Sequence, residues 1–276
     1  MASEALSGSL QMNTSRAGAV WGQHGPLLWL MVQREMRSRY AGSALGALWA
    51  YVQPLLTVAI YFLVFDVVFA MRMGEHAPTE RVGTYLVVGA LPWLGFAEGL
   101  SRGASSLVDS AGILQKNALP PDLFVMRSVM ASWLAFMPIM VLLAVLYGFL
   151  TGHWKSLAIM PLLLVLQLAL TYLAAHVLAI LTAATRDTTQ VLSFALGVGI
   201  FLSPVLFPLS LFPEPWQWAL YLNPMSSWVM AYQAVMLSGQ WPPIHLWLGM
   251  VAWLLVLVFL LTWLRRNSRE ELVDWL

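Results

Sequence analysis

Residues able to do chemistry are few in this chain, and they are widely spaced. The five histidines fall in different segments, at positions 24, 76, 153, 176 and 245. The motifs H-E-x-x-H and G-x-S-x-G do not occur, and the absence of cysteine excludes disulfides and thiolate ligands. The ATP-binding pattern G-x-x-x-x-G-K-[ST] is also absent. We therefore expect no catalytic, metal or cofactor-binding site in this chain.

Four ionisable residues lie inside or beside long apolar stretches. Asp66 is expected to be a solvated acid, and His176 a packed residue with a hydrogen bond. Glu98 and Arg102 have the i,i+4 order of a structural ion pair. The alternative for each position is a functional role, because ionisable groups inside a membrane are often functional.

The first long apolar stretch determines the class of the protein. Four charges lie between Arg34 and Arg39, and no charged residue follows until Asp66. At about 1.5 Å per residue, residues 40–65 exceed the roughly 30 Å hydrocarbon core of a bilayer. A basic cluster at one end of such a span stays in the cytoplasm, which indicates that this span starts inside.

Composition supports an all-α integral membrane protein. Hydrophobic residues make up 60% of the chain and charged residues only 10%, which is too apolar for a soluble domain of this length. The net charge of +1 argues against a nucleic-acid partner. Charge-free stretches predict six spans within a transmembrane domain of residues 42–265, at about 43–70, 83–103, 128–150, 157–184, 190–211 and 246–264.

The basic residues test this topology. With six spans, both termini are cytoplasmic, including an N-terminal segment 1–24 and a tail 266–276. Of the 14 lysines and arginines, all but Arg72, Arg81 and Lys155 then fall inside, as expected for membrane proteins.

Two segments outside the spans have a distinctive pattern. Residues 25–41 predict an amphipathic interface helix, with Leu28, Trp29, Val32, Met36 and Tyr40 on one face and Arg34, Arg37 and Ser38 opposite. Such a helix is either a membrane anchor or a surface for a cytoplasmic partner. Residues 212–245 are apolar but contain many prolines and tryptophans. We interpret them as a re-entrant helical hairpin in the outer leaflet.

Small and aromatic residues mark possible contact faces. Gly95, Gly99 and Gly103 form a smooth stripe, either for packing within one chain or for a dimer seam, and Gly42 and Gly46 repeat the spacing. The aromatic residues of the first and fifth spans either face lipid and protein or line a path for sugar rings. With one glutamine, the candidate path-lining residues are Trp49, Tyr51, Gln53, Tyr61, Phe62, Phe65, Phe194 and Phe201.

Several segments in order resemble one family. The run from Gln33 to Leu56, the segment Leu114–Pro120, and the stretch from Phe201 to Trp216 followed by Leu222-Asn223-Pro224-Met225 resemble type-2 ABC exporter permeases for surface polysaccharides. The likeness covers residues 25–265. The entry to the first span is most similar to the O-antigen branch, while capsule and teichoic-acid permeases are close neighbours.

The resemblance implies a bacterial inner-membrane homodimer with two separate ATP-binding subunits, which hold ATP and Mg. It implies an undecaprenyl-linked polysaccharide as substrate, a channel lined by spans 1 and 5, and a gate formed by the interface helix. The gate residues would be Arg34, Arg37, Arg39 and Tyr40. The ATPase-coupling residues would be Leu107, Asp109, Ile113, Leu114, Gln115, Lys116 and Asn117. Family members usually have a more basic coupling loop than this one.

Two other functions compete with polysaccharide export. One is a drug or small-lipid permease of the same fold. The other is a membrane-embedded transferase acting on lipid-linked sugars, which would need paired acids or a catalytic histidine facing one cavity.

Overall fold

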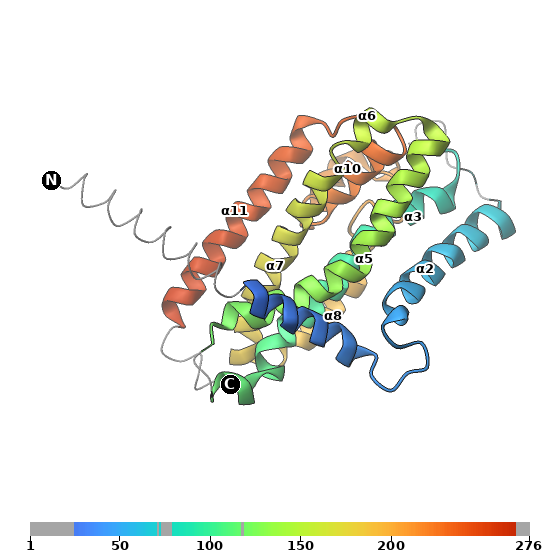
Figure 1. The fold of residues 1–276 in the computed structure, drawn as a ribbon. Helices are drawn as coiled ribbons and strands as arrows, with labels where there is room; N and C mark the ends of the chain where they lie inside the picture. The colour runs from blue at the N-terminus through green and yellow to red at the C-terminus, as the bar shows by residue number, and fades with distance from the viewer. Residues whose placement is uncertain (1–24, 71, 73–78, 117–118, 269–276) are drawn as a thin grey trace.

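The computed structural model describes residues 25–70, 72, 79–116 and 119–268. The predicted segment 1–24, residues 269–276 of the predicted tail 266–276, and Asn117 lie outside the described residues. Regular structure in these ranges is helical, apart from one isolated bridge between Arg72 and Arg81. Figure 1 shows an elongated bundle with α2 at one edge and α11 at the other.

Three long helices form the centre of the bundle: α3 (Val82–Asp109), α5 (Pro121–Thr151) and α7 (Met160–Ala184). The short α6 (Trp154–Leu157) joins α5 to α7, and α11 (Ile244–Asn267) packs on α7. Because α3 contacts both α5 and α7 extensively, it is the most enclosed of the long helices.

The glycine stripe of α3 makes this close packing possible. A Cβ at Gly99 would lie 2.8 Å from Thr171 Cγ2 on α7, and one at Gly103 would lie 2.5 Å from Ala175 Cβ. The stripe therefore packs within one chain, and the dimer-seam alternative for it is wrong. Higher residue numbers on α3 meet higher numbers on α7, so the two helices run parallel.

Gly42 and Gly46 do not continue such a stripe. Their φ angles are +82° and +53°, and a Cβ at either would meet nothing within 4 Å. Both glycines instead form an open turn between the interface helix and α2, where left-handed backbone favours glycine. The prediction that they form a second packing stripe is therefore wrong.

Within the part of the chain that the structure describes, four helical segments are long and apolar enough to cross a membrane: Gly46–Val68, Pro121–Thr151, Trp154–Ala184 and Ile244–Asn267. The first combines η1 (Gly46–Leu48), α2 (Trp49–Tyr61) and η2 (Phe62–Val68), and only 6% of its most apolar window is buried. The long helix α3 is not among the four. It carries glycines and the charged Glu98 and Arg102, and its neighbours in the bundle cover it instead of lipid.

The predicted fifth span, 190–211, is helical only in its first half. Helix α8 (Thr188–Gly199) has 12 residues, about 18 Å at 1.5 Å per residue. Pro204 and Pro208 follow, and proline interrupts a helix by removing a backbone donor. The carbonyl of Pro204 accepts hydrogen bonds from Tyr85 Oη at 2.8 Å and Gln233 Nε2 at 2.9 Å. Side chains thus satisfy this irregular backbone, as the membrane interior requires.

The segment after α8 contains only short helices: η3 (Leu209–Leu211), η4 (Glu214–Trp216), α9 (Gln217–Leu220) and α10 (Ser226–Met236). The chain returns to the end of α8, where Asn223 Nδ2 donates to Gly199 O at 2.8 Å. The tryptophans of this region divide into two groups. Trp216, Trp218 and Trp241 are exposed, as expected for tryptophans at the membrane interface. Trp228 is fully buried in the core, so an interfacial position is wrong for this residue.

Asp66 joins the end of the first span to the start of α3. Its carboxylate accepts a hydrogen bond from Gly83 N at 2.7 Å and one from Thr84 Oγ1 at 3.0 Å. The first amides of a helix lack partners within that helix and favour a nearby negative charge. Asp66 is therefore a capping residue supplied by another helix, and its description as a merely solvated acid is wrong.

Candidate functional site

A cavity of about 520 Å³ opens between five segments of the chain. The end of the interface helix, α2, α3, α5 and α8 each contribute to its wall. The lining residues are Arg39, Tyr40, Ala50, Gln53, Pro54, Thr57, Leu94, Ala97, Glu98, Ser101, Arg102, Ala135, Phe136, Ser193 and Leu196. Charged groups gather at one end, and most of the remaining wall is apolar or weakly polar.

Arg39 lies at the charged end of the cavity and is almost completely buried, with a side chain only 6% exposed. It donates to Ser132 Oγ and to Ser128 O, both at 3.1 Å, and thereby ties the interface helix to α5. Two carboxylates lie near it, Glu35 at 3.4 Å and Glu98 at 3.8 Å. Burial lowers the pKa of Arg39 from its usual value, but arginine remains charged at neutral pH.

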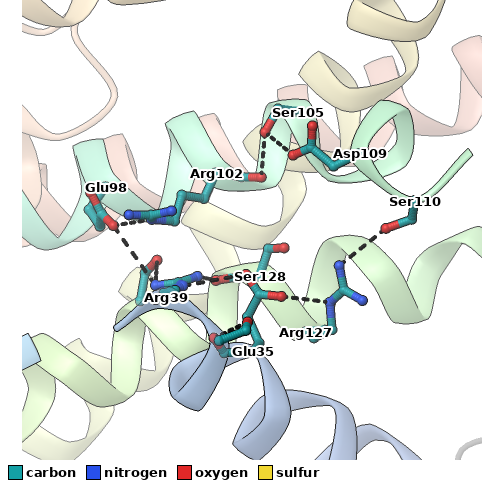
Figure 2. A network of polar contacts seen from close by, with 11 residues as sticks. Glu35, Arg39, Glu98, Arg102, Ser105, Asp109, Ser110, Arg127 and Ser128 are labelled. Carbon is teal, nitrogen blue, oxygen red and sulfur yellow. Dashed lines mark hydrogen bonds and ion pairs between the residues drawn. The ribbon is translucent and has the colours of Figure 1, made fainter. Parts of the chain in front are cut away.

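Glu98 and Arg102 form the ion pair that their spacing predicts. The pair is not isolated, because Glu98 also faces Arg39 across the gap between the two helices (Figure 2). One carboxylate thus lies between two guanidinium groups at the wall of the cavity. Glu35 also pairs with Arg39, so two carboxylates accompany the two guanidinium groups. A guanidinium group can donate hydrogen bonds to an anionic group such as a phosphate.

The interface helix, residues 25–39, turns most of its predicted apolar face to the bundle and leaves its predicted polar face exposed, with one exception. Leu28 and Val32 are buried as expected, but Trp29 is 48% exposed and belongs to the outer face. Arg34 and Arg37 are exposed, whereas Arg39 points into the bundle. The sequence predicted an apolar face with Arg34, Arg37 and Ser38 opposite. It did not predict that Arg39 is buried on the same side as the apolar residues.

The candidate channel residues are not gathered at one place. Of the eight, only Gln53 lines the cavity. Phe62, Phe194 and Phe201 are exposed by 44%, 73% and 60%, Trp49 is exposed by 37%, and Tyr51, Tyr61 and Phe65 are partly buried. Tyr61 and Phe65 contact edge to face with ring centres 6.4 Å apart. These rings lie on α2, on η2, on α8 and just after α8, and this chain leaves most of them uncovered or only partly buried.

The predicted coupling segment is the last turn of α3 followed by α4 (Ala111–Leu114). Leu107 is fully buried inside the chain, so its assignment as a docking side chain is wrong. Leu114 is only partly exposed and packs against the core. Ile113 is 48% exposed. Asp109, Gln115 and Lys116 are exposed as well.

Two polar clusters were missed in the sequence. Arg127 and Ser128 on α5 contact the interface helix across a sequence separation that no spacing rule covers. His176 is packed as predicted, with Tyr172 Oη one turn away at 3.3 Å from its Nδ1. Two further partners are distant in the sequence: Asp122 lies 3.4 Å from His176 Nε2, and Arg265 lies 3.2 Å from the same atom. This second cluster holds the ends of α5, α7 and α11 together.

The chain is similar to known transport proteins. Residues 26–237 match the family model of the ABC-2 type transporter. The O-antigen export system permease protein RfbA of Myxococcus xanthus is 30% identical over 259 residues, which cover 91% of this chain and 96% of that protein. A protein of the same name from Klebsiella pneumoniae is 24% identical over 216 residues, covering 77% and 81% respectively.

Proposed function

Because this chain belongs to the ABC-2 type transporter family, we propose that it is the membrane subunit of an ATP-driven exporter of lipid-linked polysaccharide. The predicted resemblance to permeases of this type is confirmed. The relatives named for O-antigen export favour O-antigen as the polysaccharide, and an undecaprenyl lipid as its carrier.

The cavity beside Arg39 is the observation that carries this proposal. A lipid-linked sugar has an anionic phosphate group, a polar glycan and an apolar tail. The two arginines suit the phosphate, Gln53 and Ser193 offer hydrogen bonds, and Phe136 offers an apolar surface. The cavity lies next to α2 and α8, so a substrate head held there is beside the predicted path.

A dimeric channel is supported by the surfaces that one chain leaves uncovered. The first span is almost unburied, and α8 exposes Phe194 on its outer side. Two copies facing each other through these helices would enclose a path with aromatic walls, which suit the apolar faces of sugar rings. The irregular segment after α8 then forms the re-entrant hairpin near the outer end of that path.

The orientation of the helices supports six crossings. Because α3 runs parallel to α7 and is enclosed by the bundle, it crosses together with its neighbours. Helix α8 and the turns after it supply the remaining crossing. In the proposed topology, the interface helix, α4 and both termini are on the cytoplasmic side of a bacterial inner membrane, which the distribution of basic residues supports.

ATP hydrolysis is assigned to a separate ABC subunit, since the sequence has no phosphate-binding loop. The partner's contact surface is α4 and the residues beside it, with Ile113 as the apolar side chain and Asp109, Gln115 and Lys116 as the polar rim. Asn117 remains a proposed member of this surface. The outer face of the interface helix, with Arg34 and Arg37, lies against membrane lipids.

Three alternative functions remain for comparison. Capsular polysaccharide or teichoic acid would use the same cavity chemistry, and a drug or small-lipid permease would need no polar path for a glycan. A transferase would require an available acid in the cavity, but Glu98 is held between Arg39 and Arg102. The transferase is therefore the weakest alternative.

Deletion of the gene and analysis of the cell's glycans test the proposed function. The deletion strain should lose surface O-antigen and accumulate lipid-linked polysaccharide inside, and the intact gene should restore export. Normal surface O-antigen with loss of another glycan would favour the capsule or teichoic-acid alternative. Unfinished glycan chains inside the cell would favour the transferase.

A further inference from the structure

Arg127 lies near the start of α5 and reaches two segments that are distant in the sequence. Its Nη2 donates to Ser110 Oγ at 3.1 Å. Its Nε lies 3.3 Å from Glu35 Oε2, in an ion pair that is not aligned as a hydrogen bond. The side chain is 16% exposed, and its Cζ lies 5.3 Å from the centre of the Phe124 ring. The guanidinium is therefore held between these groups.

The two contacts of Arg127 belong to different functional segments. Ser110 is the residue at which α3 ends and α4 begins. Its carbonyl accepts hydrogen bonds from two backbone amides of α4, Ile113 N at 2.9 Å and Leu114 N at 3.0 Å. Glu35 lies on the interface helix and also contacts Arg39 at 3.4 Å. Figure 2 shows the resulting series of contacts from Ser110 through Arg127 and Glu35 to Arg39 and Glu98.

The covalent chain provides no short connection between these segments. The interface helix continues into α2 through the turn at Gly42 and Gly46, where a Cβ would meet nothing within 4 Å. Leu28 and Val32 hold the helix on the bundle by apolar burial. The polar contacts of Arg127 do reach from this helix to the start of α4.

We propose that Arg127 is a positioning residue that transmits displacement of α4 to the interface helix and thereby to Arg39 at the cavity. The inference rests on the proposed function, because the displacement comes from the partner ATPase. A planar guanidinium suits this role, since it can hold a hydroxyl and a carboxylate at the same time in fixed directions. A lysine at this position would keep the charge but not this geometry.

We call the contacts of Arg127 with Ser110 and Glu35 the Arg127 bridge. Two single-cysteine reporters can test the bridge, because the native chain has no cysteine. Gly112→Cys reports on α4, where a Cβ meets nothing within 4 Å. Arg34→Cys reports on the exposed face of the interface helix. Each cysteine carries a spin label in the full complex with the ATPase subunit. The measured quantity is the change in the mobility of the label when a non-hydrolysable ATP analogue is added.

Both labels should respond to the nucleotide in the otherwise unchanged protein. In Arg127→Ala the response at position 112 should persist, while the response at 34 should fall about threefold or more, within the range for single contacts in coupled networks. Ser110→Ala, Glu35→Gln and Arg127→Lys should lower the response at 34 as well. Arg186→Ala, which removes an exposed arginine outside the cluster, should leave both responses unchanged.

The possible failures are distinguishable. A response at 34 that survives in Arg127→Ala, or that is absent from the unchanged protein while position 112 responds, overturns the bridge alone. A silent label at 112 in the unchanged protein contradicts the proposed coupling surface, and the bridge with it. Because apolar burial holds the interface helix, Arg127→Ala should still assemble, which purification of the complex checks.

Discussion

At the scale of single residues, the arginines of the interface helix differ in environment although they are close in sequence. Arg34 and Arg37 are exposed, and Arg39 is buried among two serines and two carboxylates. The sequence predicts Glu98 and Arg102 as a pair because both lie on one helix at a fixed spacing. It could not predict the contacts of Arg39 with α5, since these depend on how two helices pack.

Arg39→Ala should destabilise the protein by about 3 kcal/mol, because it removes a buried guanidinium group that donates to Ser132 and Ser128 and neighbours two carboxylates. Glu35 and Glu98 would each lose a neighbouring positive charge. Thermal unfolding of the purified protein in detergent measures the effect as a lower Tm. Arg37→Ala is the matched control, and its effect should stay within about 0.5 kcal/mol because its side chain is exposed. Equal Tm values for the two variants would show that the contacts of Arg39 do not stabilise the folded protein.

At the scale of elements, the sequence predicted helices well where the apolar stretch is long. The first, third, fourth and last spans are each a long apolar helix in the structure. The prediction failed for residues 200–211, because Pro204 and Pro208 interrupt a stretch that is apolar enough to resemble a continuous helix. The partners that satisfy this backbone, Tyr85 and Gln233, come from other helices and leave no local signal.

The glycine stripe gives a direct test of packing between elements. Gly103→Ala should cost about 1–3 kcal/mol through overpacking, because the new Cβ would lie 2.5 Å from Ala175 Cβ. Gly112→Ala on α4 should be neutral or slightly stabilising, since alanine favours helix more than glycine does. Chemical or thermal unfolding of both variants measures the difference. Equal stabilities would mean that α3 and α7 can separate without cost.

At the scale of the whole molecule, the topology depends on whether α3 crosses the membrane. Its charges and glycines keep it out of the set of four apolar helices, yet it is enclosed by α5 and α7. The long apolar stretch before Glu98 and the distribution of basic residues predicted this span from the sequence. It could not show why the helix tolerates polar groups, which the surrounding bundle explains.

Introduced cysteines distinguish six crossings from four. Lys155→Cys should react with an impermeant reagent in intact cells. Gln115→Cys and Arg186→Cys should react only after the membrane is opened. All three positions are exposed in the structure, so access depends on the side of the membrane. Labelling of Gln115→Cys from outside would mean that α3 does not cross, and would remove α4 from contact with a cytoplasmic ATPase.

Transport in a purified system tests the central proposal most directly. Proteoliposomes are prepared with this chain and its ATPase subunit, both with their cytoplasmic sides outward. Labelled undecaprenyl-linked O-antigen is then added to the outer side of these proteoliposomes. With ATP, an increasing share of the glycan should become protected from an added glycosidase. Omitting the ATPase subunit, the nucleotide or this chain should abolish protection, and the chain alone should hydrolyse no ATP. Unprotected glycan in the complete system, or robust ATP turnover by the isolated chain, would contradict the account.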